Sequence, residues 1–176
     1  MAAQALRRLG LDRVIWLVTP GNPLKAADPA GALGERVSLV ERVAKGPSFV
    51  VSDIEARMGL RYSLDTVLWL KARFPGVRFV WIMGADSLAS FDLWKGWTDL
   101  VREIPIAVVS RPGLAIRSRF SPMARRFAQG RLPLARARSL AFANPPAWIY
   151  IPAPFHFISS TDLRKRGLKK TGHRAT

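Results

Sequence analysis

The chain has 176 residues and a mass of 19.5 kDa, which is the size of one ordinary domain. Hydrophobic residues make up 49% of it and charged residues 23%, a globular composition that excludes a disordered or fibrous protein. Cysteine is absent, which excludes disulfides, thiolate zinc sites and cysteine nucleophiles, and 28 basic against 12 acidic side chains give a net charge of +16.

The first half of the chain alternates short apolar runs with stretches of helical periodicity. Pro20-Gly21 ends one such run, and Gly46-Pro47 ends a helical stretch. The expected elements are a strand over 13–19, a helix over 34–45, a strand over 48–54 and a helix over 64–74 that Ser63 caps.

The second half continues the alternation and contains the strongest strand signal, RFVWIM, which ends at Gly84. Gly130 and Pro133 interrupt a long helical stretch near the end of the chain. The expected elements are strands over 78–83, 106–110 and 148–151, short helices over 86–91, 97–103 and 160–167, and two helical pieces within 121–143.

Apolar strands that alternate with helices predict a parallel, doubly wound α/β sheet covered on both faces. Ligands of such sheets bind in the loops that follow the carboxyl ends of the strands. We therefore expect one domain over 1–168, a basic tail over 169–176 and a site made by strand-end loops. Because no apolar run approaches the roughly 18 residues of a membrane-spanning helix, we expect a soluble, cytoplasmic protein.

The positive charge is concentrated in the second part of the chain. Residues 104–176 carry 14 basic side chains and one acidic side chain, Asp162, whereas residues 1–103 carry 14 basic and 11 acidic ones. Three interpretations fit this excess: an arginine-rich solvated surface, a site for phosphorylated small molecules, or a face that binds nucleic acid.

Two strand-end loops offer polar side chains for a ligand. Lys25, in PGNPLK, can pair with a phosphate as a point charge, although an ordinary turn with a solvated lysine explains the loop equally well. In GADS, Asp86 and Ser87 stand at a helix start, where the carboxylate either caps the helix or accepts hydrogen bonds from a ribose or a base.

Two further segments combine features that suit a nucleotide. The aromatic side chains of SFDLWKGW, among them Trp94 and Trp97, either stack on a flat heterocycle or cover the edge of the core. In ISSTDLR, three hydroxyls gather at a helix N-terminus and Arg164 follows one turn later. That segment is either an anion site or a plain cap with a solvated arginine.

Taken together and in this order, WLVTPGNPLK, RYSLDT, FVWIMGADSLASFDLWKGW, IAVVSRPG and ISSTDLR resemble motifs of the bacterial nicotinate-nucleotide adenylyltransferases, especially the short alphaproteobacterial type. The resemblance covers about 6–166. It implies a Rossmann-like nucleotidyltransferase fold. It also implies ATP, used with Mg²⁺, and nicotinate mononucleotide as substrates, and deamido-NAD and pyrophosphate as products, in NAD biosynthesis.

The resemblance further implies roles for individual residues. Tyr62 and Ser63 match the loop whose backbone recognises the nicotinate carboxylate, Trp94 matches the position that stacks on the pyridine ring, and Arg111 matches an arginine that lines the site. The residues matched to ATP are Asp86 and Ser87 on the adenosine side, and Ser159, Ser160, Thr161 and Arg164 at the phosphate-binding helix start. Lys25 matches a basic residue near the nucleotide phosphate and, with Arg164, is an expected catalytic residue.

The chain departs from the family's pattern at its start. Members open with a strand, a Gly-Gly-Ser/Thr-Phe-Asn/Asp-Pro loop and a His-x-x-His motif, whereas residues 1–14 resemble the second half of the first helix running into the second strand. The first strand lies in the middle of the family's 3-2-1-4-5 sheet, so we expect central strands without ladder partners and weak or no activity. The hypothesis is that Met1 is a misassigned internal start or that the chain is a degraded gene product.

Other functions stay open at this stage. Another adenylyltransferase of the superfamily would prefer nicotinamide mononucleotide or phosphopantetheine, and a non-catalytic remnant would bind nucleotide without turnover. A basic nucleic-acid-binding module would bind arbitrary DNA or RNA with a steep salt dependence. The resemblance favours the enzyme, with no nucleic-acid or membrane partner, and leaves a homo-oligomer open.

Overall fold

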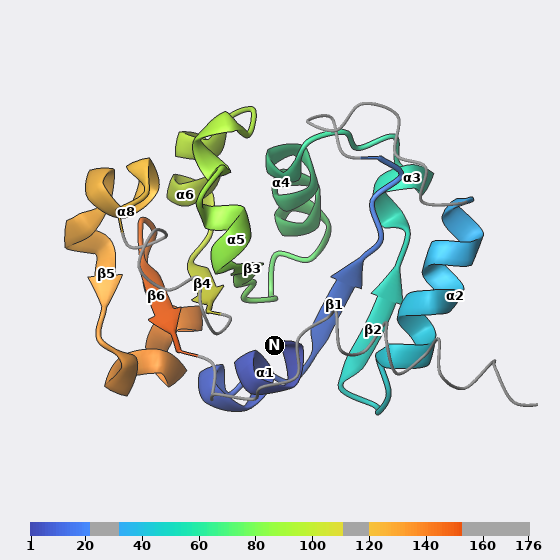
Figure 1. The fold of residues 1–176 in the computed structure, drawn as a ribbon, viewed down its shortest axis with the longest axis horizontal. Helices are drawn as coiled ribbons and strands as arrows, with labels where there is room; N and C mark the ends of the chain where they lie inside the picture. Colours follow the sequence, from blue (N-terminus) through green and yellow to red (C-terminus); the bar gives the residue numbers. More distant parts are fainter. Residues whose placement is uncertain (22–31, 111–119, 153–176) are drawn as a thin grey trace, which may run out of the picture.

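The protein is described by a computed structural model, which covers residues 1–21, 32–110 and 120–152. These residues form an α/β fold with two parallel sheets (Figure 1). In the first sheet, β1 (Val14–Leu17) pairs with β2 (Phe49–Ser52). The second has the order β3-β4-β6-β5, made by β3 (Trp81–Gly84), β4 (Ile106–Val109), β6 (Trp148–Ile151) and β5 (Arg131–Leu132).

Helices connect and cover these strands. They are α1 (Ala2–Leu9), α2 (Leu33–Val43), α3 (Ile54–Arg57), α4 (Ser63–Arg73), α5 (Ala85–Leu88), α6 (Trp97–Glu103) and α8 (Pro122–Arg126), with 3-10 helices η1 (Phe91–Leu93), η2 (Ala128–Gly130) and η3 (Leu134–Phe142). In Figure 1, α1 lies at the bottom of the view, between the two sheets. None of these helices is long and apolar enough to cross a membrane.

The core is built on the two faces of the second sheet. Every residue of β4 and β6 is buried, and their side chains alternate between the faces because the period of a strand is two. On one face, Ile106 and Trp148 pack with Phe91 and Leu100. On the other face, the side chain of Ile149 packs with residues of α1 and η3. The prediction of fully covered parallel strands is confirmed for β4 and β6, whereas β3 is only partly buried over its first half.

The first sheet is less covered, and the prediction of a buried strand over 13–19 is wrong in this respect. The strand forms over Val14–Leu17, but Ile15 is 42% exposed and Val50, on the neighbouring strand, is 36% exposed. The helix that packs beside them, α2, has no buried residue. The apolar pattern predicted burial, but neither core cluster contains a residue of β1 or β2, because both clusters form around the second sheet. Val14 of β1 is buried, but it lies outside both clusters.

The other expected elements form with shifted ends, and one segment differs. The two helical pieces expected within 121–143 are instead α8, η2, the two-residue strand β5 and η3. A Cβ on Gly130 would collide with the carbonyl oxygen of Pro146, so this glycine lets the chain pass close enough for β5 to pair with β6. The short helix α3 was not expected, and the helix expected over 160–167 lies outside the described residues.

The two sheets are separate, and each has a strand whose other edge is open within the described residues. There, β1 pairs with β2 alone and β3 pairs with β4 alone, as expected for central strands that lack ladder partners. Each of these two strands also carries a buried indole N–H, of Trp16 and of Trp81, for which the described part of the chain provides no acceptor. A buried polar group without a hydrogen-bond partner lowers the free energy of unfolding by about 1–3 kcal/mol.

Candidate functional site

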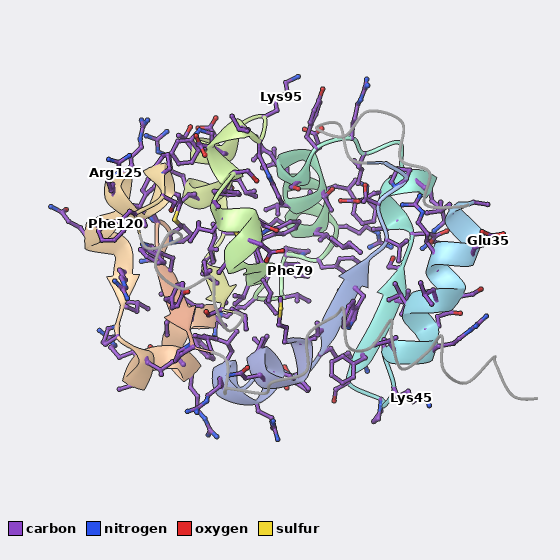
Figure 2. The ribbon with its side chains drawn as sticks, viewed as in Figure 1. Glu35, Lys45, Phe79, Lys95, Phe120 and Arg125 are labelled. Carbon is purple, nitrogen blue, oxygen red and sulfur yellow. The ribbon has the colours of Figure 1, made fainter. Side chains whose placement is uncertain are left out.

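A cavity of about 1290 Å³ lies between the two sheets. Its wall includes Trp16 of β1 and Trp81 of β3, and Tyr62 and Ser63 at the start of α4. Figure 2 places Phe79, another wall residue, in the middle of the molecule between the sheets. Its wall is mostly apolar with a few polar groups, as in small-molecule sites, although its volume exceeds their usual range of about 300–1,000 Å³.

The start of α4 brings Tyr62 and Ser63 to the cavity wall. Tyr62 has an extended backbone (φ −122°, ψ 147°), and the helix begins at Ser63. The prediction that Ser63 caps this helix is wrong: Tyr62 occupies the N-cap position, and no side-chain hydrogen bond caps the helix. The turn therefore presents backbone groups of the first helical turn beside the cavity.

Trp94 and Trp97 have different surroundings. Trp94 lines the cavity and makes edge-to-face contacts with Trp81 (ring centroids 6.5 Å apart) and Phe91 (5.2 Å). Trp97 contacts Phe91 (6.1 Å) and Phe127 (6.0 Å) and is not part of the cavity wall. Covering the edge of the core is thus the role of Trp97, whereas Trp94 packs on the core and also borders the cavity.

Gly96 allows the segment that carries Trp94 and Lys95 to lie against α4. Its φ of +69° is in the left-handed region, and a Cβ there would lie 2.7 Å from Leu64 Cδ2. The turn holds the Lys95 Nζ 4.4 Å from the ring centroid of Tyr62. A positive charge therefore lies at the part of the cavity wall that Tyr62 and Ser63 form.

Asp86 and Ser87 follow β3 in the short helix α5, as expected from the sequence. The interpretation of Asp86 as a helix cap is not supported, because Gly84 is the N-cap residue and no side chain caps the helix. A Cβ on Gly84 would collide with the Asp86 carboxylate, so the glycine lets this side chain fold back over the strand end. Gly84 lines the cavity, whereas Asp86 and Ser87 do not.

The remaining expected site residues lie outside the described residues. They are Lys25, Arg111, Ser159, Ser160, Thr161 and Arg164. The structure thus groups Tyr62, Ser63 and Trp94 around one cavity and leaves the expected phosphate-binding groups untested. In the described ranges, no three His, Asp or Glu side chains gather closely enough to hold a metal ion.

One polar pair beside the cavity was not predicted from the sequence. The Thr66 hydroxyl donates a hydrogen bond to Glu55 Oε1 at 2.9 Å, and both residues are buried. Glu55 also lines the cavity. A single Glu in a short polar segment gives no local signal of burial, since Glu is normally exposed unless it has a partner.

Comparisons with known proteins place these residues in a wider context. A model of the cytidylyltransferase-like family matches residues 1–166. The probable nicotinate-nucleotide adenylyltransferase of Caulobacter sp. (strain K31) is 53% identical over 169 residues, which are 96% of this chain and 89% of that protein. Proteins with the same description from Cereibacter sphaeroides (strain ATCC 17025 / ATH 2.4.3) and Brucella suis biovar 1 (strain 1330) are 48% and 45% identical, over 95% and 97% of this chain and 88% of each relative.

Proposed function

The chain belongs to the cytidylyltransferase-like family and is similar over nearly its whole length to probable nicotinate-nucleotide adenylyltransferases, and on this premise we propose that it transfers the adenylyl group of ATP to nicotinate mononucleotide. The products are deamido-NAD and pyrophosphate, and the reaction belongs to NAD biosynthesis in the cytoplasm. The observation that carries the proposal is the identity of 53% over 96% of the chain. The cavity that groups Tyr62, Ser63 and Trp94 supports it.

In this proposal the pyridine mononucleotide binds at the start of α4. Backbone N–H groups near Tyr62 and Ser63 donate hydrogen bonds to the nicotinate carboxylate, since the first N–H groups of a helix have no partner within the helix. The exposed side of Trp94 stacks on the pyridine ring, and Arg111 lines the same site. Lys95 adds positive charge beside the carboxylate position.

ATP binds, as its Mg²⁺ complex, at the carboxyl end of β3, where Asp86 and Ser87 follow the strand. Asp86 and Ser87 contact the adenosine. The hydroxyls of Ser159, Ser160 and Thr161 and the guanidinium of Arg164 hold the phosphates, and Lys25 supplies a further cation. The metal in the complex neutralises charge on the phosphate oxygens.

The transfer needs no protein nucleophile. An oxygen of the mononucleotide's 5′-phosphate attacks the α-phosphorus of ATP in line, and the bond from that phosphorus to the oxygen of the leaving pyrophosphate breaks. The protein contributes positioning and electrostatic stabilisation. Lys25 and Arg164 stabilise the charge that develops on pyrophosphate as it leaves.

The test is the release of pyrophosphate from ATP by the purified chain, measured with nicotinate mononucleotide, nicotinamide mononucleotide or phosphopantetheine as the acceptor. We expect release with the acid mononucleotide and formation of deamido-NAD, at a low rate because residues 1–14 do not match the family's opening motifs. A higher rate with one of the other acceptors would assign the chain a different adenylyl transfer. Binding of ATP and mononucleotide without any pyrophosphate would identify a non-catalytic nucleotide-binding protein.

A further inference from the structure

The carboxylate of Glu55 is buried between two helices, with the residue only 8% exposed. It accepts a hydrogen bond from the hydroxyl of Thr66, which is fully buried in α4. A buried carboxylate is costly unless it is hydrogen-bonded, and bonds to a charged acceptor are among the stronger ones. The pair therefore fixes α3, which carries Glu55, against the first turns of α4.

Glu55 is connected to both ends of the segment that precedes α4. At one end, the N–H of Leu60 donates to the backbone oxygen of Glu55 at 2.8 Å. At the other end, Thr66 binds the Glu55 side chain, and the backbone N–H of Thr66 donates to the carbonyl oxygen of Tyr62 at 3.1 Å. Residues 61–63, which line the cavity, therefore lie between two hydrogen bonds to Glu55, one to its backbone and one to its side chain.

The Thr66 hydroxyl has a second acceptor within reach. Its oxygen lies 3.3 Å from the carbonyl oxygen of Tyr62, compared with 2.9 Å from Glu55 Oε1. A hydroxyl has one proton to donate, and the shorter bond to a carboxylate is the stronger of the two. Without Glu55, this proton turns to the Tyr62 carbonyl and changes the bonding of the turn that begins α4.

We propose that Glu55 is a positioning residue for the pyridine mononucleotide: through its hydrogen bond with Thr66, its side chain sets the place of the Tyr62–Ser63 backbone at the cavity wall. This inference rests on the proposed function, in which that backbone receives the nicotinate carboxylate. It assigns Glu55 no contact with the reacting atoms. Its effect is on the affinity for the mononucleotide and not on the affinity for ATP.

The experiment compares Thr66→Val, Thr66→Ser and Glu55→Gln with the unaltered chain. Calorimetry measures the Kd of nicotinate mononucleotide and, separately, the Kd of Mg²⁺-ATP. We expect Thr66→Val to raise the mononucleotide Kd about tenfold, Glu55→Gln about threefold, and Thr66→Ser less than twofold, with the Kd of ATP unchanged.

The matched control is Ser121→Ala. Ser121 is also buried, and its hydroxyl accepts a hydrogen bond from the N–H of Ala124 at 3.3 Å, at the start of α8 and outside the cavity wall. This variant loses the hydrogen bond of a buried hydroxyl. We expect it to lower the Tm and to leave the mononucleotide Kd unchanged. A similar result for Thr66→Val would show that the pair is only structural and would overturn the proposal.

The double variant Glu55→Met/Thr66→Val separates stability from positioning. Replacing both buried partners by apolar groups of similar shape removes the cost of an unpaired polar group, so the Tm recovers relative to the single variants. The mononucleotide Kd stays about tenfold raised if the pair positions the turn, and recovers with the Tm if it does not. If the unaltered chain binds no nicotinate mononucleotide, it is the proposed function itself that fails.

Discussion

The ammonium group of Lys95 lies 4.4 Å from the centre of the Tyr62 ring. This cation–π contact joins the segment before Gly96 to the residue that precedes α4, and it is worth about 0.5–1 kcal/mol at an exposed position. Because the contact keeps a positive charge beside the expected place of the nicotinate carboxylate, it bears on the choice between the acid and the amide mononucleotide.

Replacing Lys95 by Met should reduce the preference of the protein for the acid mononucleotide over the amide mononucleotide. We expect the Kd of nicotinate mononucleotide to rise about three- to tenfold and the Kd of nicotinamide mononucleotide to change little, because its amide group is uncharged and only the carboxylate of the acid loses a charge interaction. Added salt should reduce the difference between the unaltered chain and the variant. Calorimetry with the two mononucleotides at low and high salt measures both effects.

Lys45→Met is the matched control for this prediction. Lys45 is exposed between α2 and β2, and Figure 2 shows it at the opposite end of the molecule from Lys95. The Lys45→Met substitution changes the net charge by the same amount as Lys95→Met. An equal loss of preference in both variants would mean that total charge, and not the position of Lys95, governs the selection.

Trp94→Ala should weaken mononucleotide binding about tenfold, because stacking of an aromatic side chain on a base is worth about 1–3 kcal/mol. Trp94→Phe keeps an aromatic face and should retain most of the affinity. Trp97→Phe is the control, since Trp97 packs on Phe91 and Phe127 and does not line the cavity. Quenching of tryptophan fluorescence on titration gives the Kd values, and full affinity in Trp94→Ala would remove Trp94 from the site.

Arg164→Ala should lower kcat/KM for ATP about ten- to a hundredfold, because a guanidinium–phosphate hydrogen bond is charge-assisted and acts on the leaving pyrophosphate. Pyrophosphate release measures the effect. Arg174→Ala removes the same charge from the expected tail and should leave the rate unchanged. Unaltered kinetics in Arg164→Ala would refute its role in holding phosphate.

The two sheets should differ in local stability. The strand β4 is buried throughout and pairs on both edges, whereas in the described part of the chain β1 pairs on one edge and is partly exposed. Amide hydrogen exchange should therefore be slow for 106–109 and much faster for 14–17, since less buried units open at lower free energy. Equal protection of both strands would show that the molecule opens as one unit.

The sequence alone was enough to predict the elements whose signal lies in their own residues. The apolar runs that became β4 and β6 were located almost to the residue, because strands buried on both faces are continuously apolar. Trp94 and Tyr62 were placed near a ligand by the resemblance, and the structure brings both to one cavity. The helix cap expected of Ser63 did not form, and neither did the cap that was one of the two interpretations of Asp86.

What the sequence could not provide depends on distant contacts. The strand Arg131–Leu132 has no pattern of its own and forms because β6 offers it an edge. The burial of Glu55 depends on a hydroxyl eleven positions away along the chain, and nothing in the local residues indicates that partner. The exposure of Ile15 likewise depends on the position of the core, which forms around the second sheet. The residues next to Ile15 in the sequence carry no signal of that position.

The edges of β1 and β3 that the described residues leave unpaired also bear on how the protein behaves in solution. An unpaired strand edge is a template on which another molecule can form a ladder, and such contacts lead to aggregation. A net charge of +16 keeps separate molecules apart in dilute buffer, but dissolved ions shorten the reach of that repulsion. The protein should therefore remain dispersed at low ionic strength and precipitate as salt is added, so purification and storage in dilute buffer should give the highest yield.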